Sequence, residues 1–214
     1  MSDKSHARLR PQPDNRFAFF QGFLRRPLEV GSIIPSSRFL ERRVARAASL
    51  GSARVAVELG PGTGGTTRAF LRALPGTSKL LAIEINQDFI PVLGRLTRDP
   101  RLIVQLGSAA DLRLLLDKND LDPPDVVLSG IPFSTMPREL GLEIIRCVHD
   151  ALPPGGLFVA YQVRDRVETL GREVFGRASV QTELLNVPPM RVYRWEKQAQ
   201  ATVEHSTSAA PAPS

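Results

Sequence analysis

From Arg54 onward, short apolar segments alternate along the sequence with stretches of helical periodicity. The pattern predicts strands at residues 54–59, 79–85, 101–106, 125–129 and 156–163. It predicts helices near residues 65–74, 87–96, 109–117, 138–152 and 165–175. Two further strands are expected at 179–186 and 191–196, and the short connection Val187–Met190 between them indicates an antiparallel hairpin. The sequence therefore predicts an α/β fold with a mostly parallel seven-stranded sheet, helices on both faces and a C-terminal hairpin.

The composition excludes several classes of protein. Cys147 is the single cysteine and there are three histidines, which excludes a disulfide framework and a cysteine zinc cage, and we expect no metal. No run of 18 apolar residues is present, so we expect no membrane-spanning helix. The start of the chain, Met1 to Arg10, is polar and basic and lacks the apolar core of a secretory signal. We therefore expect the protein in the cytoplasm.

Positive charge is concentrated at the start of the chain. Residues 1–54 contain 11 Lys/Arg and 4 Asp/Glu, whereas residues 55–214 contain 17 and 18. This asymmetry indicates an anionic partner, either nucleic acid or a membrane surface. A solvated basic face or a disordered arm explains the same charge distribution, and the two interpretations stand at this point.

The segment Arg16–Arg26 has the pattern of a short helix with one aromatic face. The apolar residues fall at helical spacing and arginines flank them; they are Phe17, Phe20, Phe23 and Leu24. Such a helix can lie in a bilayer interface, or it can pack on the protein core. Pro27 limits it, because the residue before a proline avoids the α region.

A second basic helix is expected within residues 36–51. Ser36 or Ser37 can cap its start, and Gly51 suits its C′ position. Its apolar stripe consists of Leu40, Val44 and Ala47/Ala48. Its arginines recur every four residues on one face and either meet phosphates or are simply solvated; they are Arg38, Arg42 and Arg46. We divide the chain into an N-terminal arm with these two helices (1–51), a main domain (52–197) and a disordered tail (198–214).

A glycine-rich loop, Gly60-Pro61-Gly62-Thr63-Gly64, follows the first predicted strand and opens a helix. Glycines permit a sharp turn and let a ligand approach the backbone, and the helix start presents unpaired N–H groups. Glu84 ends the second predicted strand, 24 residues after Gly60, which is about the spacing at which an acid binds ribose hydroxyls. With Gly65 as third glycine, the loop also fits a dinucleotide oxidoreductase. Glycines that merely turn the chain are the remaining alternative.

The motif Glu58-Leu-Gly-Pro-Gly-Thr-Gly64 resembles the first motif of class I S-adenosylmethionine-dependent methyltransferases, which have a Rossmann-like fold. The resemblance implies S-adenosylmethionine as cofactor and S-adenosylhomocysteine as product. It implies a cofactor site made of Glu58, Gly60, Gly62, Gly64, Glu84, Ile85, Ser108 and Ala109. Many members carry an acid where this chain has Ser108. Asp111 either replaces that acid or caps a helix.

The segment Ser129-Gly130-Ile131-Pro132-Phe133 follows the fourth predicted strand. It resembles the Asn/Asp-Pro-Pro-Tyr motif of methyltransferases that act on amino nitrogen, with Ser129 and Phe133 in place of the polar residue and the tyrosine. The resemblance implies that Ser129, Gly130 and Ile131 form the catalytic set that orients the amine. A plain turn built by Gly130 and Pro132 is the alternative.

Together with Val30–Ser37 and Asn186–Pro189, these motifs resemble bacterial phospholipid N-methyltransferases of the rhizobial type and the similar ornithine lipid enzymes. The resemblance implies methyl transfer to the primary amine of phosphatidylethanolamine, giving products up to phosphatidylcholine, or of ornithine lipid. It implies that Arg16–Arg26 docks on the anionic inner face of the membrane. We expect Gly31–Ser37 to cover the cofactor and the protein to be a monomer. The base is left open between Tyr161, a carboxylate near the pocket and water.

Two other functions compete with lipid methylation. An RNA adenine or small-molecule amine N-methyltransferase shares the fold and a similar loop after the fourth strand, and the basic N-terminal residues would then contact phosphates. Such RNA enzymes commonly append a further domain, and the chain contains one Trp and two Tyr for stacking on flipped bases, so we expect nucleic acid not to be the partner. The second is a membrane-binding module on an inactive fold, which need not have kept Glu58, Glu84 and the loop glycines.

Overall fold

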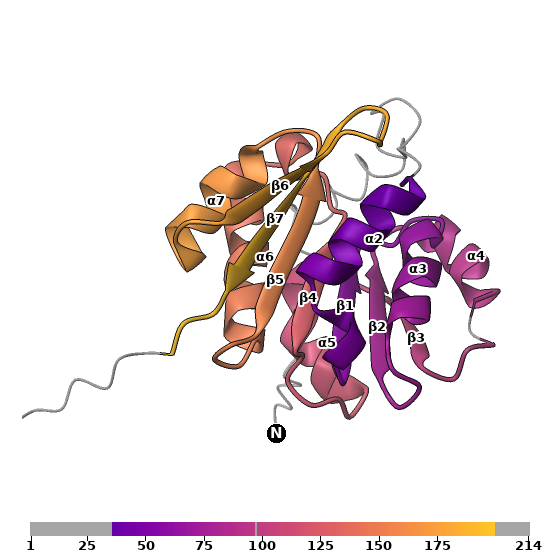
Figure 1. The fold of residues 1–214 in the computed structure, drawn as a ribbon. Coiled ribbons are helices and arrows are strands. Elements are labelled where there is room, and N and C mark those ends of the chain that lie inside the picture. The colour runs from indigo at the N-terminus through magenta and orange to yellow at the C-terminus, as the bar shows by residue number, and fades with distance from the viewer. Residues whose placement is uncertain (1–35, 97, 200–214) are drawn as a thin grey trace, which may run out of the picture.

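The computed structural model describes residues 36–96 and 98–199 and contains one seven-stranded sheet with helices on both faces (Figure 1). The strands are β1 (Val55–Leu59), β2 (Lys79–Glu84), β3 (Leu102–Leu106), β4 (Val126–Ser129), β5 (Leu157–Gln162), β6 (Ser179–Glu183) and β7 (Met190–Glu196). Their order in the sheet is β3-β2-β1-β4-β5-β7-β6. Strands β1 to β5 are parallel, and β7 runs antiparallel to both β5 and β6. The expected fold class is confirmed.

The helices form two layers around the sheet. They are α2 (Arg38–Ala47), α3 (Gly65–Ala73), α4 (Ile90–Gly94), α5 (Leu112–Lys118), α6 (Arg138–Ala151) and α7 (Arg166–Phe175). Helices α2 and α3 cover one face, and α5, α6 and α7 cover the other (Figure 1). Short 3₁₀ turns lie at η1 (Leu50–Ser52), η2 (Gln87–Phe89), η3 (Ala109–Asp111) and η4 (Phe133–Thr135). Within the described residues, none of the helices is long and apolar enough to cross a membrane.

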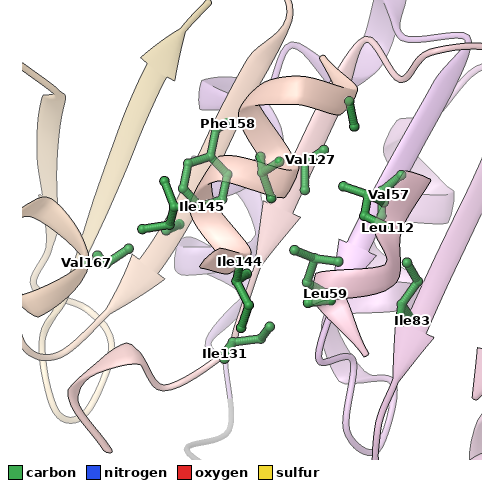
Figure 2. Close-up of a cluster of buried hydrophobic side chains, with 14 of the residues drawn as sticks. Val57, Leu59, Ile83, Leu112, Val127, Ile131, Ile144, Ile145, Phe158 and Val167 are labelled. Carbon is green, nitrogen blue, oxygen red and sulfur yellow. The ribbon is translucent and has the colours of Figure 1, made fainter. Parts of the chain in front are cut away.

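The strands are apolar on both faces because each face packs against helices. Successive residues of a strand point to opposite faces, so Val57 and Leu59 join the core beneath α5 to α7, while Ala56 joins the core beneath α2 and α3. Figure 2 shows the first of these cores, in which the strand residues Val57, Val127 and Phe158 face the helix residues Leu112 and Ile145. A sheet buried on both faces holds its strand ends rigidly, which positions the loops that follow them.

Helix α2 begins where expected and ends earlier than expected. Ser37 is its N-cap, and the Ser37 hydroxyl accepts a hydrogen bond from the Leu40 N–H at 3.2 Å. The predicted stripe is buried against the sheet. The helix stops at Ala47, and Ser49 takes the left-handed conformation, with φ of 50°, that we had assigned to Gly51. Gly51 lies in η1 instead, so its assignment to the C′ position was wrong.

Two predicted helices are split, and one predicted strand is shorter. The segments 87–96 and 109–117 each open with a 3₁₀ turn, because Asn86 and Ser108 cap those turns by accepting N–H groups two residues ahead. Strand β6 ends at Glu183 rather than at residue 186, because its carboxylate accepts the Leu185 N–H and turns the chain. The hairpin connection is therefore residues 184–189. Our expectations for Arg16–Arg26, for Gly31–Ser37 as far as residue 35 and for the tail from residue 200 lie outside the described residues.

Candidate cofactor and amine site

The loops that follow β1, β2, β3 and β4 gather at one edge of the sheet. Parallel pairing places Leu59 opposite both Ile83 and Ser129, and Glu84 opposite Leu106, so all four strands end at the same level. The chain continues from β1 outward to β3 and then returns to β4 on the other side of β1. A reversal of this kind opens a crevice at the carboxyl ends of the strands, where α/β proteins bind their ligands.

The three loop glycines adopt conformations that favour glycine. Gly60, Gly62 and Gly64 have φ of 73°, 56° and 80°. A Cβ on Gly60 would lie 3.2 Å from Ile131 Cγ1, and one on Gly64 would lie 2.6 Å from Leu96 Cδ1. A Cβ on Gly62 would meet no atom within 4 Å. The loop is thus packed at both ends and open at Gly62, so a ligand can reach the backbone there.

Glu84 is buried at the end of β2 and holds the glycine loop. Its Oε2 accepts the Gly62 N–H at 2.9 Å and its Oε1 accepts the Asn86 N–H at 2.8 Å. Burial raises the pKa of the Glu84 carboxyl above its ordinary value, while the N–H groups that it accepts oppose the shift. A carboxylate has about four acceptor positions, so Glu84 retains capacity for the hydroxyls of a ribose beside Gly62.

Glu58 is fully buried beneath the start of α3. Its two oxygens accept the hydroxyl protons of Thr66 and Thr67 at 2.5 and 2.6 Å. Burial, opposed by these two hydrogen bonds, raises the pKa of Glu58 to about 7. Glu58 therefore ties β1 to the first turn of α3 through two hydrogen bonds made within the protein itself.

The residues after β2 and β3 line the same edge. Ser108 and Ala109 are buried, and Ile85 is half-buried against the core. The Ser108 hydroxyl accepts the Ala110 N–H at 3.1 Å. Asp111 is exposed at the N-cap position of α5 and makes no capping hydrogen bond with its side chain.

The loop after β4 is held through both polar groups of the Ile131 main chain. The Ile131 N–H donates to the Ser129 hydroxyl at 3.3 Å, and the Ile131 carbonyl accepts a hydrogen bond from the Gln162 side-chain amide. Ser129 and Gln162 are both buried. Sequence reasoning missed Gln162; the available signal was a polar residue near the end of the otherwise apolar segment 156–163.

Gly130 lies between β1 and β5 with no room for a side chain. A Cβ at this position would be 2.8 Å from the Tyr161 hydroxyl and 3.3 Å from the Gly60 carbonyl oxygen. The Tyr161 hydroxyl also donates to the Thr66 hydroxyl at 3.4 Å. Phe133, which stands where the similar motif has a tyrosine, is fully buried within the core. The glycine loop, the loop after β4 and Tyr161 therefore form one contiguous site.

The site fits S-adenosylmethionine in its donor set. Gly64 offers no capping side chain to α3, so the N–H groups of the first turn of α3 point toward the loop with no intrahelical acceptor and can receive a carboxylate. Glu84 would offer acceptors to a ribose, and Ser108 and Ala109 follow β3 at the same edge of the sheet. Among the described residues, no group of three His, Cys, Asp or Glu side chains is arranged to hold a metal ion.

Comparison with known proteins supports this class. No protein-family model matches the sequence. The O-methyltransferase TomG of Streptomyces achromogenes, solved with S-adenosylmethionine, superposes with a TM-score of 0.63 at 16% identity, over 88% of this chain and 92% of TomG. The N-methyltransferase NodS of Bradyrhizobium japonicum superposes with a TM-score of 0.58 at 14% identity, over 74% of this chain and 94% of NodS. Together with the sequence relatives described next, these neighbours identify the protein as a class I S-adenosylmethionine-dependent methyltransferase.

Sequence relatives narrow the family. The ornithine lipid N-methyltransferase of Singulisphaera acidiphila is 30% identical over 179 residues, which are 83% of this chain and 93% of that protein. The ribosomal RNA small subunit methyltransferase A of Phenylobacterium zucineum is 29% identical over 147 residues, and the chain spans about half of its length (48%). This chain belongs to the ornithine lipid N-methyltransferase family and is an N-methyltransferase.

Proposed function

We propose that this protein transfers methyl groups from S-adenosylmethionine to the primary amine of a membrane lipid head group, with ornithine lipid as the first candidate acceptor. The observation that carries the proposal is the match to the ornithine lipid enzyme over 93% of that relative's length. Phosphatidylethanolamine presents the same chemical group, a primary amine at a bilayer surface, and is the second acceptor to test. Under this proposal the protein acts at the inner face of the membrane as a peripheral enzyme.

The proposed cofactor site uses the predicted residues in different ways. The open backbone at Gly62 and the start of α3 receive the methionine half, and the Glu84 carboxylate accepts the ribose hydroxyls. Ile85, Ser108 and Ala109 border the adenine. Glu58 acts indirectly, because its hydrogen bonds to Thr66 and Thr67 fix the start of α3.

The amine is oriented by the loop after β4. The bound cofactor supplies a methyl group on a positively charged sulfur, which is already activated for transfer. A neutral amine needs hydrogen-bond acceptors that fix the direction of its lone pair, and the main-chain carbonyls of Gly130 and Ile131 and the Ser129 hydroxyl are the proposed acceptors. The Ile131 carbonyl already accepts hydrogen bonds from the Gln162 side-chain amide and from the Phe133 N–H at 3.0 Å, so Gly130 and Ser129 are the principal proposed acceptors.

The protein favours a neutral amine through its surroundings rather than through a strong base. Burial disfavours a charged ammonium and so lowers the pKa of the amine. Tyr161 does not suit the role of proton acceptor, because burial raises the pKa of its hydroxyl and the group stays protonated. The Tyr161 oxygen still has lone pairs that can accept an amine N–H beside Gly130, while its proton is directed to Thr66.

RNA adenine methylation is the second candidate function, and the ribosomal RNA relatives are the observation that favours it. These relatives match 44–67% of this chain, less than the 83% matched by the lipid enzyme. Adenine also presents an amino nitrogen, so the same loop can serve either acceptor.

A labelling assay separates these acceptors. The full chain is incubated with S-adenosylmethionine labelled in its methyl group and with one of three acceptors: anionic vesicles containing ornithine lipid, the same vesicles containing phosphatidylethanolamine, or ribosomal RNA. We expect label in extracted ornithine lipid. Label in phosphatidylethanolamine alone would reassign the head group, and label in RNA alone, with neither lipid labelled, would replace the proposal by its rival.

A further inference from the structure

The connection between β6 and β7 carries large apolar side chains in full contact with solvent. Leu184 is 72% exposed, Leu185 is 62% exposed and Val187 is 88% exposed. We call these three side chains the hairpin tip. Single exposed apolar residues are common on protein surfaces, but three within four positions form a patch that usually has a partner.

The hairpin tip is held in place by buried polar groups. Asn186 is buried, its Oδ1 accepts the Ser37 N–H at 2.8 Å, and its Nδ2 donates to the Pro188 carbonyl at 3.0 Å. The buried Glu183 carboxylate accepts the Leu185 N–H at 2.9 Å. The loop backbone is therefore fixed to the body of the protein while its apolar side chains point outward, so their exposure is a feature of the fold and not of a frayed end.

The hairpin tip lies at the same edge of the sheet as the site. Strand β7 runs antiparallel to β5 and pairs Arg191 with Gln162, so the start of β7 meets the carboxyl end of β5. In Figure 1 the β6–β7 connection stands at the top of the molecule, beside the start of α2 and beyond the carboxyl end of β5. A surface that binds the tip would face the edge where the methyl group is transferred.

Positive charge adjoins the tip. A groove of about 310 Å³ between α2 and the hairpin is lined by arginines of α2 and by Leu185 of the tip; the arginines are Arg42, Arg43 and Arg46. Arg43 pairs with Glu183 at 2.8 Å. Within the described part of the chain, Arg42 and Arg46 are exposed and lie within 4 Å of no carboxylate. Their charge is available to an external anion.

We infer that the hairpin tip and the arginine face of α2 together contact an anionic lipid bilayer, the tip entering the interface and the arginines meeting lipid phosphates. Apolar side chains beside basic ones suit the boundary between acyl chains and anionic head groups. This inference rests on the proposed lipid substrate and adds a contact surface to the one that the sequence predicts at Arg16–Arg26. It orients the site edge toward the bilayer, so a head-group amine reaches the loop after β4 without leaving the membrane.

Vesicle flotation of the full chain tests the inference. The test variant is Leu184→Ser/Leu185→Ser/Val187→Ser, and the matched control is Leu114→Ser, which alters a side chain that is 66% exposed on α5. We expect the triple variant to lose at least tenfold in partitioning to phosphatidylglycerol vesicles and the control to lose nothing. Because these side chains are exposed, both variants should keep the thermal midpoint and the cofactor affinity of the parent.

The contribution of the α2 arginines is tested by removing the charge of Arg42 and comparing anionic with uncharged vesicles. We expect Arg42→Gln to weaken binding about fivefold on phosphatidylglycerol vesicles and to have no effect on phosphatidylcholine vesicles. Arg113→Gln, which alters an exposed arginine of α5, is the control and should change neither. Added salt should reduce the difference between parent and Arg42→Gln.

Unchanged flotation of the triple variant would overturn the inference, even if lipid is methylated. If vesicle binding requires the hairpin tip but no lipid is methylated, the inference is supported and the proposed lipid substrate is wrong. Sedimentation velocity is run on the same variants. If the triple variant loses self-association and keeps vesicle binding, the tip is an interface between copies of this chain and the inference fails.

Discussion

The Gln162 side-chain amide donates a hydrogen bond to the Ile131 main-chain carbonyl, which joins the end of β5 to the loop after β4. The two residues are 31 positions apart, and both groups are buried. The Ser129 hydroxyl accepts the N–H of the same residue. Both polar groups of the Ile131 main chain are thus fixed, which sets the direction of the acceptors that the proposed amine would meet.

Replacing Gln162 by leucine tests whether the position of the loop after β4 affects methyl transfer without affecting cofactor binding. The Ile131 carbonyl would lose one of its two donors and keep the Phe133 N–H, so we expect the free energy of unfolding to fall by about 0.5–1.5 kcal/mol. We expect kcat for methyl transfer to fall roughly 10- to 100-fold, because small displacements of a positioned acceptor are costly. Cofactor affinity, measured by calorimetry, should be unchanged.

The matched control is Gln181→Leu, assayed with lipid dispersed in detergent. Gln181 accepts a hydrogen bond from Arg43 on the exposed side of β6, away from the loop after β4. Its kcat should equal that of the parent. A Gln162→Leu enzyme with parental kcat would show that the Gln162 hydrogen bond is not needed to position the loop after β4.

Gly130→Ala should damage the site chiefly through its contact with the Tyr161 hydroxyl. The new methyl carbon would lie 2.8 Å from the Tyr161 hydroxyl, so we expect a loss of about 1–3 kcal/mol in stability and at least tenfold in activity. The double variant Gly130→Ala/Tyr161→Phe removes the contacting oxygen and should recover part of the stability in thermal melts. The contact with the Gly60 carbonyl at 3.3 Å remains, so recovery should be incomplete. Equal melting of the single and double variants would show that Tyr161 does not crowd Gly130.

The architecture and the positions of the motif residues followed from local sequence pattern. Apolar periods and turn residues are local properties, so the strands, the glycine loop and the placement of Glu84 and Ser129 at one edge could be predicted. The role of Gln162 could not be predicted, because its partner Ile131 becomes a neighbour only when β4 and β5 pair in the sheet.

The predicted element boundaries were wrong in two places, for two reasons. The Glu183 carboxylate ends β6 by accepting the Leu185 N–H, and Ser49 takes the left-handed backbone conformation that a glycine usually supplies at the end of a helix. Glu58 carries the same lesson for the site. Its acidic side chain suggested a contact with a ligand, but in the structure it accepts hydrogen bonds from Thr66 and Thr67. These partners follow from how α3 packs on β1, which a local sequence pattern does not show.

Glu84→Ala should weaken cofactor binding severely. The variant loses the proposed ribose acceptor and also the bond that holds the Gly62 N–H. We expect the dissociation constant of S-adenosylmethionine to rise at least tenfold, because charge-assisted hydrogen bonds are among the stronger ones. Calorimetry with S-adenosylhomocysteine measures the same site without turnover. Unchanged affinity for both would remove Glu84 from the ribose role.

Gly62→Ala tests whether a ligand approaches the loop backbone. Its Cβ would meet no protein atom within 4 Å, and its φ of 56° costs an alanine about 1–2 kcal/mol. Gly155→Ala is the matched control, since Gly155 has φ of 81°, equally open space and a position before β5 at the opposite edge of the sheet. Both variants should lose similar stability, and we expect only Gly62→Ala to lose cofactor affinity. Equal affinities would mean that the cofactor does not contact Gly62.

The titration of Glu58 should make the free energy of unfolding depend on pH. Its pKa rises from 4.5 to about 7 on folding, so between these values the folded protein binds more protons than the unfolded chain. This stabilising contribution is complete below pH 4.5 and is lost as the pH rises through 7. Because the pKa of Glu58 differs by about 2.5 between the folded and unfolded states, the free energy of unfolding falls by on the order of 3 kcal/mol.

Glu58→Gln isolates this contribution, because glutamine does not titrate. We expect urea unfolding at a series of pH values to show the parent losing stability relative to Glu58→Gln between about pH 4.5 and 7. Glu183→Gln is the control: its partner Arg43 holds the pKa of Glu183 below its ordinary value, so that group titrates below this window and the slope should not change. Parallel curves for parent and Glu58→Gln would show that the buried carboxyl keeps an ordinary pKa, and the threonine hydroxyls would then compensate its burial in full.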